Sequence, residues 1–509
     1  MSDTDRAIRD VIKGAGVVYV GLFLELLIAF VAQVLAAQYL SVSGFGGLTT
    51  GTALLDIGSI VAGLGLAGGL TRYLPRIERE QKRSLVTTAV GVTLANSVFI
   101  GGLVALGAPV IATEVFNDPS VTVSIRIFGA AIPFSALLNI GIGGIRGEKQ
   151  SLYQVYVKNI TQPLVRFFLV IVAVVLGLDQ AGIAGAYALP YVVTSTLALF
   201  LLYRSLPRTP LQVDTDLTER VARYSIPLTA SGVAGFVYRS VDIFLILYFL
   251  DSSAVGVYGV AYAAVGFMQM FSTAFNFLGA PVASELEHGG DIEEVMSVFR
   301  PVARWLVVGS ACAFVPIGVF STEFISLIYG SRYAAGGLAL TVLALGYGSQ
   351  NVLSVNNPIL QALGRSRILA FNSVLAATVN LVLNILFIPR FGIVGAAVAT
   401  CVSFVLRDGL AAVEVRYFLD ATPIRGNVAG PALLGVPVLG GLAVVVAPAV
   451  PTTVLWLLGI SGLTCLVYCM LVIVVFGISQ TEVMVLRSIE EQYGVPVPDS
   501  IVRFLVRRR

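Results

Sequence analysis

The chain has 509 residues, of which 57% are hydrophobic and only 12% charged, and its formal net charge is +3. Because soluble proteins carry about 25% charged residues, this composition excludes an ordinary cytosolic enzyme, a nucleic-acid-binding protein and a disordered chain. We therefore expect an all-α polytopic membrane protein. The net charge is too small to indicate a class of partner.

Apolar stretches long enough to cross a bilayer recur along the whole chain, since about 20 residues span a hydrocarbon core of about 30 Å. We predict about fourteen spans, at residues 15–39, 45–71, 85–112, 121–145, 152–177, 182–203, 225–250, 254–282, 301–320, 335–362, 367–388, 392–416, 427–449 and 452–477. All the connections are short. In the longest, about 204–224, we expect Asp216 or Thr218 to cap a short helix that leads into the seventh span.

The basic residues predict how these spans are oriented, because lysine and arginine concentrate in cytoplasmic segments. With a cytoplasmic N-terminus, the inner segments hold all but six of the 32 basic residues. The six exceptions are Arg332 and Arg390 in outer segments and, inside spans, Arg126, Arg166, Arg239 and Arg407. We therefore predict a multi-pass protein of the cell membrane with both termini in the cytoplasm.

The chain also contains an internal repeat. Leu40-Ser-Val-Ser-Gly-Phe-Gly46 ends the first span, and Leu250-Asp-Ser-Ser-Ala-Val-Gly256 ends the seventh, 210 residues later. Gly-Ile-Ala-Gly-Ala at 182–186 and Gly-Ile-Val-Gly-Ala at 392–396 open the sixth and twelfth spans at the same offset. The pattern predicts two parallel six-helix bundles around a central cavity, followed by two C-terminal helices. The predicted parts are residues 1–204, 205–420 and 421–509.

Two such bundles that rock against each other give alternating access, so the architecture alone favours a transporter. Three segments add a family resemblance: the glycine-rich stretch 44–77, the seventh-span stretch 224–262, and the stretch 357–400. They resemble the lipid-linked oligosaccharide and polysaccharide flippases of the multidrug/oligosaccharidyl-lipid/polysaccharide exporter superfamily. The resemblance implies a fourteen-helix flippase whose spans 1, 2, 7 and 8 line the cavity.

Charged side chains inside the predicted spans are the candidate site residues, since each costs roughly 2.5–3.5 kcal/mol at the bilayer centre and usually faces a cavity. We place seven near mid-depth: Glu25, Asp56, Arg166, Arg239, Asp242, Arg407 and Asp408. Arg126 lies nearer the outer end of the fourth span. As phosphate-binding residues we predict Arg239, Arg126 and Arg166, because guanidinium groups suit phosphate oxygens. For ion coupling or charge pairing we predict Asp242, Glu25 and Asp56.

Two charge pairs allow more than one interpretation. Arg239 and Asp242 are three residues apart and share a helix face. Either Arg239 binds a phosphate with Asp242 as its counter-ion, or the two form a permanent structural pair. Arg407 and Asp408 are adjacent, so their side chains diverge by about 100° on a helix. We expect each to pair with other helices, in a structural role.

The sequence contains no Ser-His-Asp set, metal-ligand cluster or nucleotide-binding motif, so we expect no enzymatic activity and no cofactor. The favoured function is the flipping of a polyprenyl- or dolichyl-(pyro)phosphate-linked oligosaccharide to the outer leaflet, driven by H⁺ or Na⁺ or passive. The expected partners are that substrate, membrane lipid and glycosyltransferases, with the chain itself a monomer that does not bind nucleic acid. The alternatives are an ion-coupled drug or cation exporter and, less favoured, a membrane glycan polymerase or glycosyltransferase.

Overall fold

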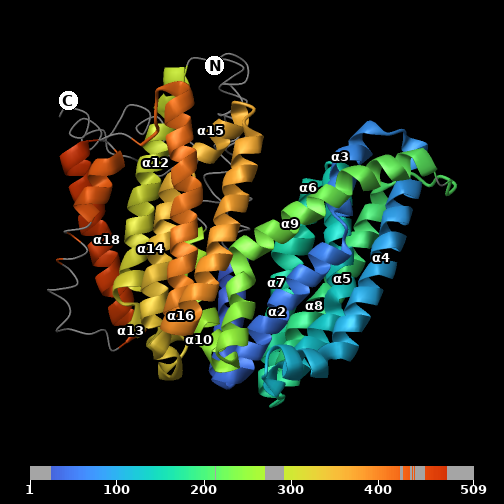
Figure 1. Ribbon diagram of the computed structural model, residues 1–509, viewed down its shortest axis with the longest axis horizontal. Helices are drawn as coiled ribbons and strands as arrows, with labels where there is room; N and C mark the ends of the chain where they lie inside the picture. Colours follow the sequence, from blue (N-terminus) through green and yellow to red (C-terminus); the bar gives the residue numbers. More distant parts are fainter. Residues whose placement is uncertain are drawn as a thin grey trace, which may run out of the picture. The chain divides into compact units, whose positions relative to one another are not determined.

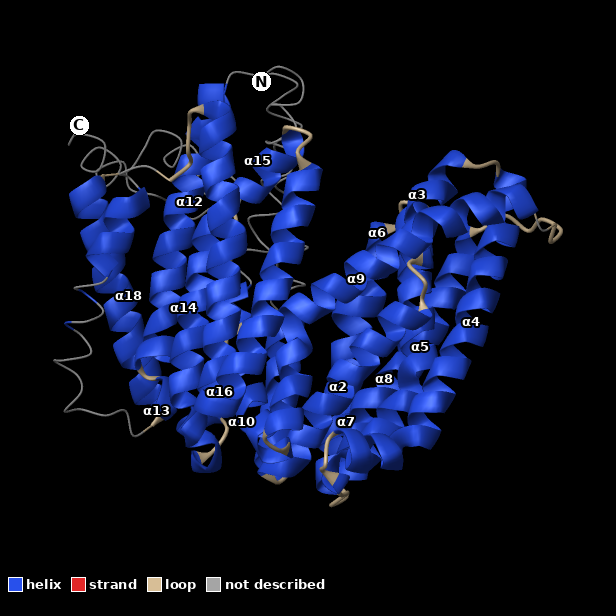
Figure 2. Cartoon of the chain, viewed as in Figure 1, coloured by secondary structure: helices blue, strands red, loops and turns tan. Residues whose placement is uncertain are grey.

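The computed structural model describes residues 24–212, 214–269, 292–424, 428–435, 438, 441 and 453–477. In this part of the chain the regular structure is helical throughout (Figure 2). Ten helices there are long and apolar enough to cross a membrane, and a shorter apolar helix covers Leu24–Tyr39. The predicted all-α polytopic fold is therefore confirmed. The count of fourteen stays a prediction, because parts of the first, eighth and thirteenth predicted spans lie outside the described residues.

The packing of the helices divides the chain into two compact units, residues 1–260 with 381–396, and residues 261–380 with 397–509. The predicted parts 1–204, 205–420 and 421–509 stay a prediction. The first unit contains α2 (Val42–Ala62), α3 (Leu66–Tyr73), α4 (Arg79–Val110), α5 (Thr122–Gly147), α6 (Ser151–Gln154), α7 (Gln162–Val175), α8 (Gln180–Ser205), α9 (Thr215–Phe249) and most of α10 (Ser252–Ala264) (Figure 1).

The second unit contains α12 (Ile292–Phe314), α13 (Ser321–Ile328), α14 (Gly337–Leu353), α15 (Asn356–Ala362), most of α16 (Ser366–Leu419) and α18 (Val454–Phe476). The long helix α16 includes the eleventh and twelfth predicted spans. They meet at Gly392, whose φ of 59° is a left-handed conformation that glycine adopts without steric cost. The break thus falls at the turn that the sequence predicts.

In the first unit, α5 is the central helix and packs against α2, α3, α4 and α8. Its C-terminal half enters a buried apolar cluster that includes Leu70, Ile145 and Leu202, all without solvent exposure. The start of α9 joins this cluster through Leu217 and Val221. The cap of α9 is Asp214, whose carboxylate accepts the Leu217 N–H at 2.9 Å. The expectation that Asp216 or Thr218 caps this helix is therefore wrong.

In the second unit, Arg407 and Asp408 form a two-pronged ion pair, with Nε–Oδ1 and Nη2–Oδ2 distances of 2.9 Å. The expectation that each would pair with other helices rather than with its neighbour is wrong. The Arg407 side chain is long enough to turn back along the helix surface, and the fully buried Asp408 makes the pair necessary. Asn357 of α15 also donates to Asp408 at 3.1 Å.

The third span of each predicted repeat ends in the same irregularity. A five-residue π-helix, Ile111–Val115, follows α4, and another, Val315–Val319, follows α12. Such π-turns are rare in helices. Their recurrence at matching points of two sequence copies is what a duplicated fold would produce.

The internal repeat also appears as a direct contact between α2 and α10. A Cβ atom on Gly46 would lie 1.7 Å from the Ser252 carbonyl oxygen, and one on Gly256 would lie 2.1 Å from the Val42 carbonyl oxygen. In the repeat, Val42 corresponds to Ser252 and Gly46 to Gly256, each 210 residues later. Gly46 therefore contacts the equivalent of Val42, and Gly256 contacts Val42 itself. The contact is therefore reciprocal, as expected on a pseudo-twofold axis.

Asp118, in the loop before α5, stabilises the position of the N-terminus of α10. Its carboxylate accepts the Ser252 N–H at 2.9 Å and the Ser120 hydroxyl at 2.6 Å. Partial burial raises the pKa of the Asp118 carboxyl, but these hydrogen bonds outweigh burial and leave the pKa below its usual range. The side chain is thus ionised at neutral pH, where it holds the start of α10 against the loop before α5.

We expect Gly46→Ala to lower thermal stability, because the added methyl group meets backbone that cannot rotate away. The control is Gly91→Ala in α4, where a Cβ meets nothing within 4 Å. In Gly91→Ala, alanine favours the helix over glycine by about 0.5–1 kcal/mol, so the thermal stability of this control should be unchanged or higher. Thermal unfolding of both variants in detergent measures the difference. Equal unfolding temperatures for the two variants would contradict the close contact.

Candidate functional site

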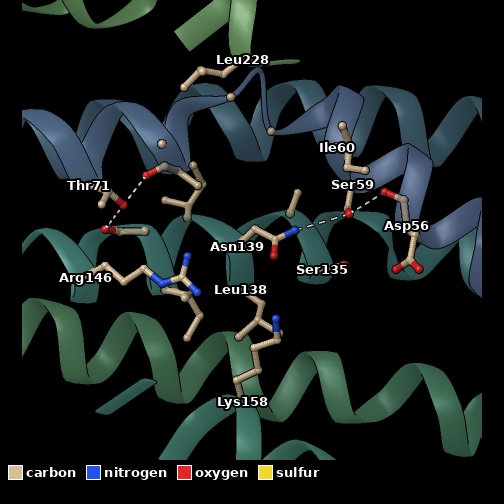
Figure 3. A pocket seen from close by; sticks show the side chains of 18 of the residues that line it. Asp56, Ser59, Ile60, Thr71, Ser135, Leu138, Asn139, Arg146, Lys158 and Leu228 are labelled. Carbon is tan, nitrogen blue, oxygen red and sulfur yellow. Dashed lines mark hydrogen bonds between the residues drawn. The ribbon is translucent and has the colours of Figure 1, made fainter. Parts of the chain in front are cut away.

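The first unit contains a partly open cavity of about 440 Å³, lined by polar and apolar side chains from α2, α3, α5, α7, α8, α9 and the segment that joins α6 to α7. This volume lies within the range of about 300–1,000 Å³ that is usual for small-molecule sites. Figure 3 shows that its labelled side chains come from helices on opposite sides. The polar and charged residues that line it are Asp56, Ser59, Thr71, Ser135, Asn139, Arg146, Lys158, Gln162, Tyr191 and Thr229.

Asp56 of α2 is the acidic group of this cavity. The positive charges of Arg166, Arg239 and Lys158 all act on its carboxylate. One turn further along α2, the Ser59 hydroxyl donates to the Asp56 carbonyl oxygen at 2.9 Å. These positive charges help an apolar bundle tolerate the carboxylate. Two cations, Arg146 and Lys158, line the cavity with it.

The segment between α6 and α7 is a seven-residue π-helix, Val155–Thr161, which carries Lys158 and Asn159. The wider turn changes the direction in which successive residues point, and π-turns of this kind are frequent at functional sites. Lys158 lines the cavity, whereas its neighbour Asn159 donates a hydrogen bond to Glu25. Lys158 and Arg166 also act electrostatically on Glu25. Lys158 of the π-helix thus acts on both carboxylates, Glu25 and Asp56.

Arg166 of α7 contacts two tyrosines of α8. Its guanidinium lies 5.0 Å from the centre of the Tyr187 ring, and it also hydrogen-bonds to Tyr191. Its Nε atom is buried and has no hydrogen-bond partner in the structure. A buried guanidinium N–H without an acceptor is costly, so this atom is suited to a ligand that brings an oxygen.

Arg146 at the end of α5 is the other cation that lines the cavity. Its Nε donates to the Gln154 side chain at 2.8 Å, which orients the guanidinium plane. In Figure 3 the Arg146 and Lys158 side chains both extend toward the space between the helices. Sequence reasoning missed both residues because it assigned them to inner segments, where basic residues are expected for topology alone. The polar stretch Lys158-Asn159 next to Pro163 was the one available signal.

Of the predicted site residues, Glu25, Asp56, Arg166 and Arg239 act on one another electrostatically, but only Asp56 of these four lines the cavity. Arg126 is exposed on α5 and is not among the residues that line the cavity, so its role stays a prediction. Asp242 is 2% exposed and accepts hydrogen bonds from the Tyr258 hydroxyl and from the Ile243 N–H. It is likewise outside the cavity lining.

The described residues contain no group of three or more His, Cys, Asp or Glu side chains arranged to hold a metal ion. The chemistry that the cavity offers is therefore that of guanidinium, ammonium, amide and hydroxyl donors around one carboxylate. Such a set recognises an anion and neutral hydroxyl groups.

Sequence comparison places this architecture in a known family. The model of the family described as "Polysaccharide biosynthesis protein" matches residues 11–286, and the chain belongs to this family. The probable low-salt glycan biosynthesis flippase Agl15 of Haloferax volcanii is 29% identical over 48% of the chain and 51% of its own length. The probable flippase AglR of the same organism is 26% identical over 73% of the chain and 76% of its own length. The chain therefore spans about half the length of Agl15.

Solved structures with the same fold include the lipid II flippase MurJ in an inward closed conformation. Its TM-score is 0.69 at 14% identity, and the match covers 89% of this chain and 98% of that one. An inward-facing multidrug resistance MATE transporter of the MOP superfamily has a TM-score of 0.62 at 15% identity, over 77% of this chain and 94% of that one. At these identities the likeness shows the fold, which is that of polytopic membrane transporters.

Proposed function

We propose that the protein flips a polyprenyl- or dolichyl-(pyro)phosphate-linked oligosaccharide from the cytoplasmic to the outer leaflet by alternating access, and that it is not an enzyme. The family membership and the flippase relatives support this function. The observation that carries it is that the charges of Arg166, Arg239 and Lys158 all act on Asp56, which lines the cavity together with Lys158. Cations kept in that environment at such cost are suited to an anionic substrate.

Arg166 and Arg239 are the proposed phosphate-binding residues. Arg166 has a buried N–H without a partner, and Arg239 is exposed on α9 while it acts on Asp56. Guanidinium groups stay charged at every physiological pH and bind phosphate oxygens through two donors at once. Asp56 balances their charge when the cavity is empty and is displaced from them by the substrate phosphate.

The alternative is a drug or cation exporter, which the likeness to MATE transporters keeps open. A site for organic cations requires an excess of negative or aromatic groups. Arg146 and Lys158 line this cavity against one carboxylate, Asp56, on which Arg166 and Arg239 also act. This charge balance favours an anionic substrate over a cationic drug.

We propose that carboxylates inside the bundle bind the coupling ion. Asp242 is buried and hydrogen-bonded to Tyr258, and Glu25 and Asp56 lie among the cations. A proton or Na⁺ that binds at Asp242 would change the charge of α9, the same helix that carries Arg239. In this proposal the monomer lies in the cell membrane with cytoplasmic termini and receives its substrate from glycosyltransferases on the inner face.

Alternating access requires α2 and α10 to separate where Gly46 and Gly256 touch. In the present structure they are in backbone contact, and Asp118 secures the start of α10. The loop that contains Asp118 follows the third predicted span and lies on the outer side in the predicted topology. We infer that this contact closes the outer side of the transporter and must open for substrate release.

We expect Arg239→Ala and Arg166→Ala each to reduce flipping by at least about tenfold, because each loses a charge-assisted hydrogen bond to phosphate. Flipping of a fluorescent lipid-linked oligosaccharide in reconstituted liposomes measures the effect. The matched control is Arg223→Ala on the same helix, where the side chain is exposed and pairs with Glu219. Wild-type flipping by folded Arg166→Ala and Arg239→Ala proteins would rule out the assignment.

For Asp242→Asn we expect transport that no longer responds to a proton or Na⁺ gradient, because the variant cannot change its charge. Tyr258→Phe removes the hydrogen-bond donor and keeps the carboxylate, so it should retain the gradient response. Flipping assayed with imposed gradients of each ion separates the two variants. An unchanged gradient response in Asp242→Asn would exclude this residue as the coupling site.

A disulfide between Thr49→Cys and Gly259→Cys should trap the closed outer contact. A Cβ atom on Gly259 would lie 3.4 Å from the Thr49 Cβ, close to the spacing of about 3.8 Å found in disulfides. In a background without the four native cysteines, oxidation should abolish flipping and dithiothreitol should restore it. Each single-cysteine variant is the control. Flipping by the cross-linked protein at the rate of the reduced protein would show that α2 and α10 need not separate.

A further inference from the structure

Within the second unit, the helices α12 and α18 pack against each other in opposite directions. The Arg304 guanidinium of α12 donates to the carbonyl oxygen of Gly477 at 2.7 Å and so holds the C-terminal end of α18. Four residues further along α12, Val308 lies in one buried apolar cluster with Tyr468 and Val472 of α18. A step forward along α12 is thus a step backward along α18, and these contacts fix the register of the two helices.

Two cysteines meet at the next turn of this contact. Cys312 follows Val308 by four residues, and Cys469 precedes Val472 by three. Their Sγ atoms are 4.0 Å apart. A disulfide requires about 2.0 Å between the two sulfur atoms, and rotation of a cysteine side chain about its Cα–Cβ bond moves the sulfur far enough to close this gap.

A third cysteine reaches the same thiol. Cys465 lies one helical turn before Cys469 on α18, and its thiol donates to the Cys312 carbonyl oxygen at 3.6 Å. The side chain of Cys465 is also within hydrogen-bonding reach of the Cys312 thiol. Cys312 therefore faces two thiols of α18, and a bond to either one would join the same two helices.

The depth of these thiols determines which molecules can reach them. Cys312 is eight residues beyond Arg304, a rise of about 12 Å along the helix. The three thiols lie within two apolar helices long enough to cross a membrane, and each is half-buried. Charged reductants of the cytosol, such as glutathione, are excluded from such an environment, whereas small neutral molecules enter it.

We propose that Cys312, Cys465 and Cys469 form an oxidisable thiol site, at which an interhelical disulfide fastens α18 to α12. The oxidant is a small neutral peroxide. The Cys312 sulfur attacks one peroxide oxygen, the O–O bond breaks, and the departing oxygen takes the thiol proton and leaves as water. This step forms a sulfenic acid, in which sulfur is oxidised by two electrons.

The second step forms the disulfide. The thiol of Cys469 or Cys465 attacks the sulfenic sulfur of Cys312, the S–O bond breaks, and a second water leaves. In total two thiols and one hydrogen peroxide give one disulfide and two waters. The remaining thiol lies beside the disulfide and can exchange with it, which moves the bond between Cys469 and Cys465 without releasing α18.

Peptide mapping of the full-length protein in liposomes tests this site. The protein is treated with hydrogen peroxide, free thiols are blocked with N-ethylmaleimide, and linked peptides are quantified by mass spectrometry without reduction. We expect at least about tenfold more linkage of Cys312 to Cys469 and Cys465 than of Cys401 to any cysteine, because loop-free proximity sets the rate. Equal linkage for Cys401, the fourth cysteine, would overturn the proposal.

Single substitutions identify the shared thiol. Cys312→Ser should abolish the linkage of α12 to α18, whereas Cys465→Ser and Cys469→Ser should each retain it through the other cysteine of α18. The matched control is Cys401→Ser in α16, which should link as the wild type does. Linkage lost in Cys401→Ser, or retained in Cys312→Ser, would contradict the assignment. If a substitution prevents folding, the wild-type peptide map alone decides.

Two further measurements on the oxidised wild-type protein distinguish a membrane-embedded tether from a surface disulfide. Its thermal unfolding temperature should exceed that of the reduced protein, because the bond restricts the unfolded chain, and Cys312→Ser should show no such difference. Dithiothreitol, which is neutral, should reverse the linkage at least about tenfold faster than glutathione at the same concentration. Equal unfolding temperatures, or equal rates of reversal, would overturn the tether.

Discussion

The constraint on which this structure depends is the cost of placing charge inside an apolar bundle. Each charged side chain there must face another charge, a hydrogen-bonding group or a polar cavity. In the first unit, Glu25, Asp56, Lys158 and Arg166 satisfy this requirement together, through Asn159, the two tyrosines beside Arg166 and the cavity itself. In the second unit, Arg407 and Asp408 satisfy it by pairing with each other.

The helix backbone follows the internal repeat, but the charges do not. Gly46 meets the backbone of α10 as Gly256 meets that of α2, and the third span of each copy ends in a π-helix. The positions 210 residues after Glu25, Asp56 and Arg166 are Gly235, Gly266 and Ala376. A duplicated scaffold thus carries an unduplicated set of ionisable groups.

The particular errors of the sequence-based predictions have physical causes. The side chains of adjacent helical residues diverge at Cβ, yet the long Arg407 side chain bends back to Asp408. The pair forms because an unpaired carboxylate would be costly where Asp408 is fully buried. Asp214 caps α9 in place of Asp216 or Thr218, because several polar residues in one connection compete for the same N–H groups. Arg146 and Lys158 were read as topology signals, since a basic residue near the inner face has the same sequence pattern whether it faces water or a cavity.

The sequence by itself determined the membrane location, the approximate spans, the repeat offset and which charges are unusual, because hydropathy, charge asymmetry and spacing are local properties. Tertiary structure alone decided which of those charges act on one another, that a π-helix sends Lys158 and Asn159 to different partners, and that Gly46 and Gly256 meet. These features depend on side-chain direction and on contacts between segments far apart in the chain. A linear pattern records the presence of a charged residue, and only packing determines what it faces.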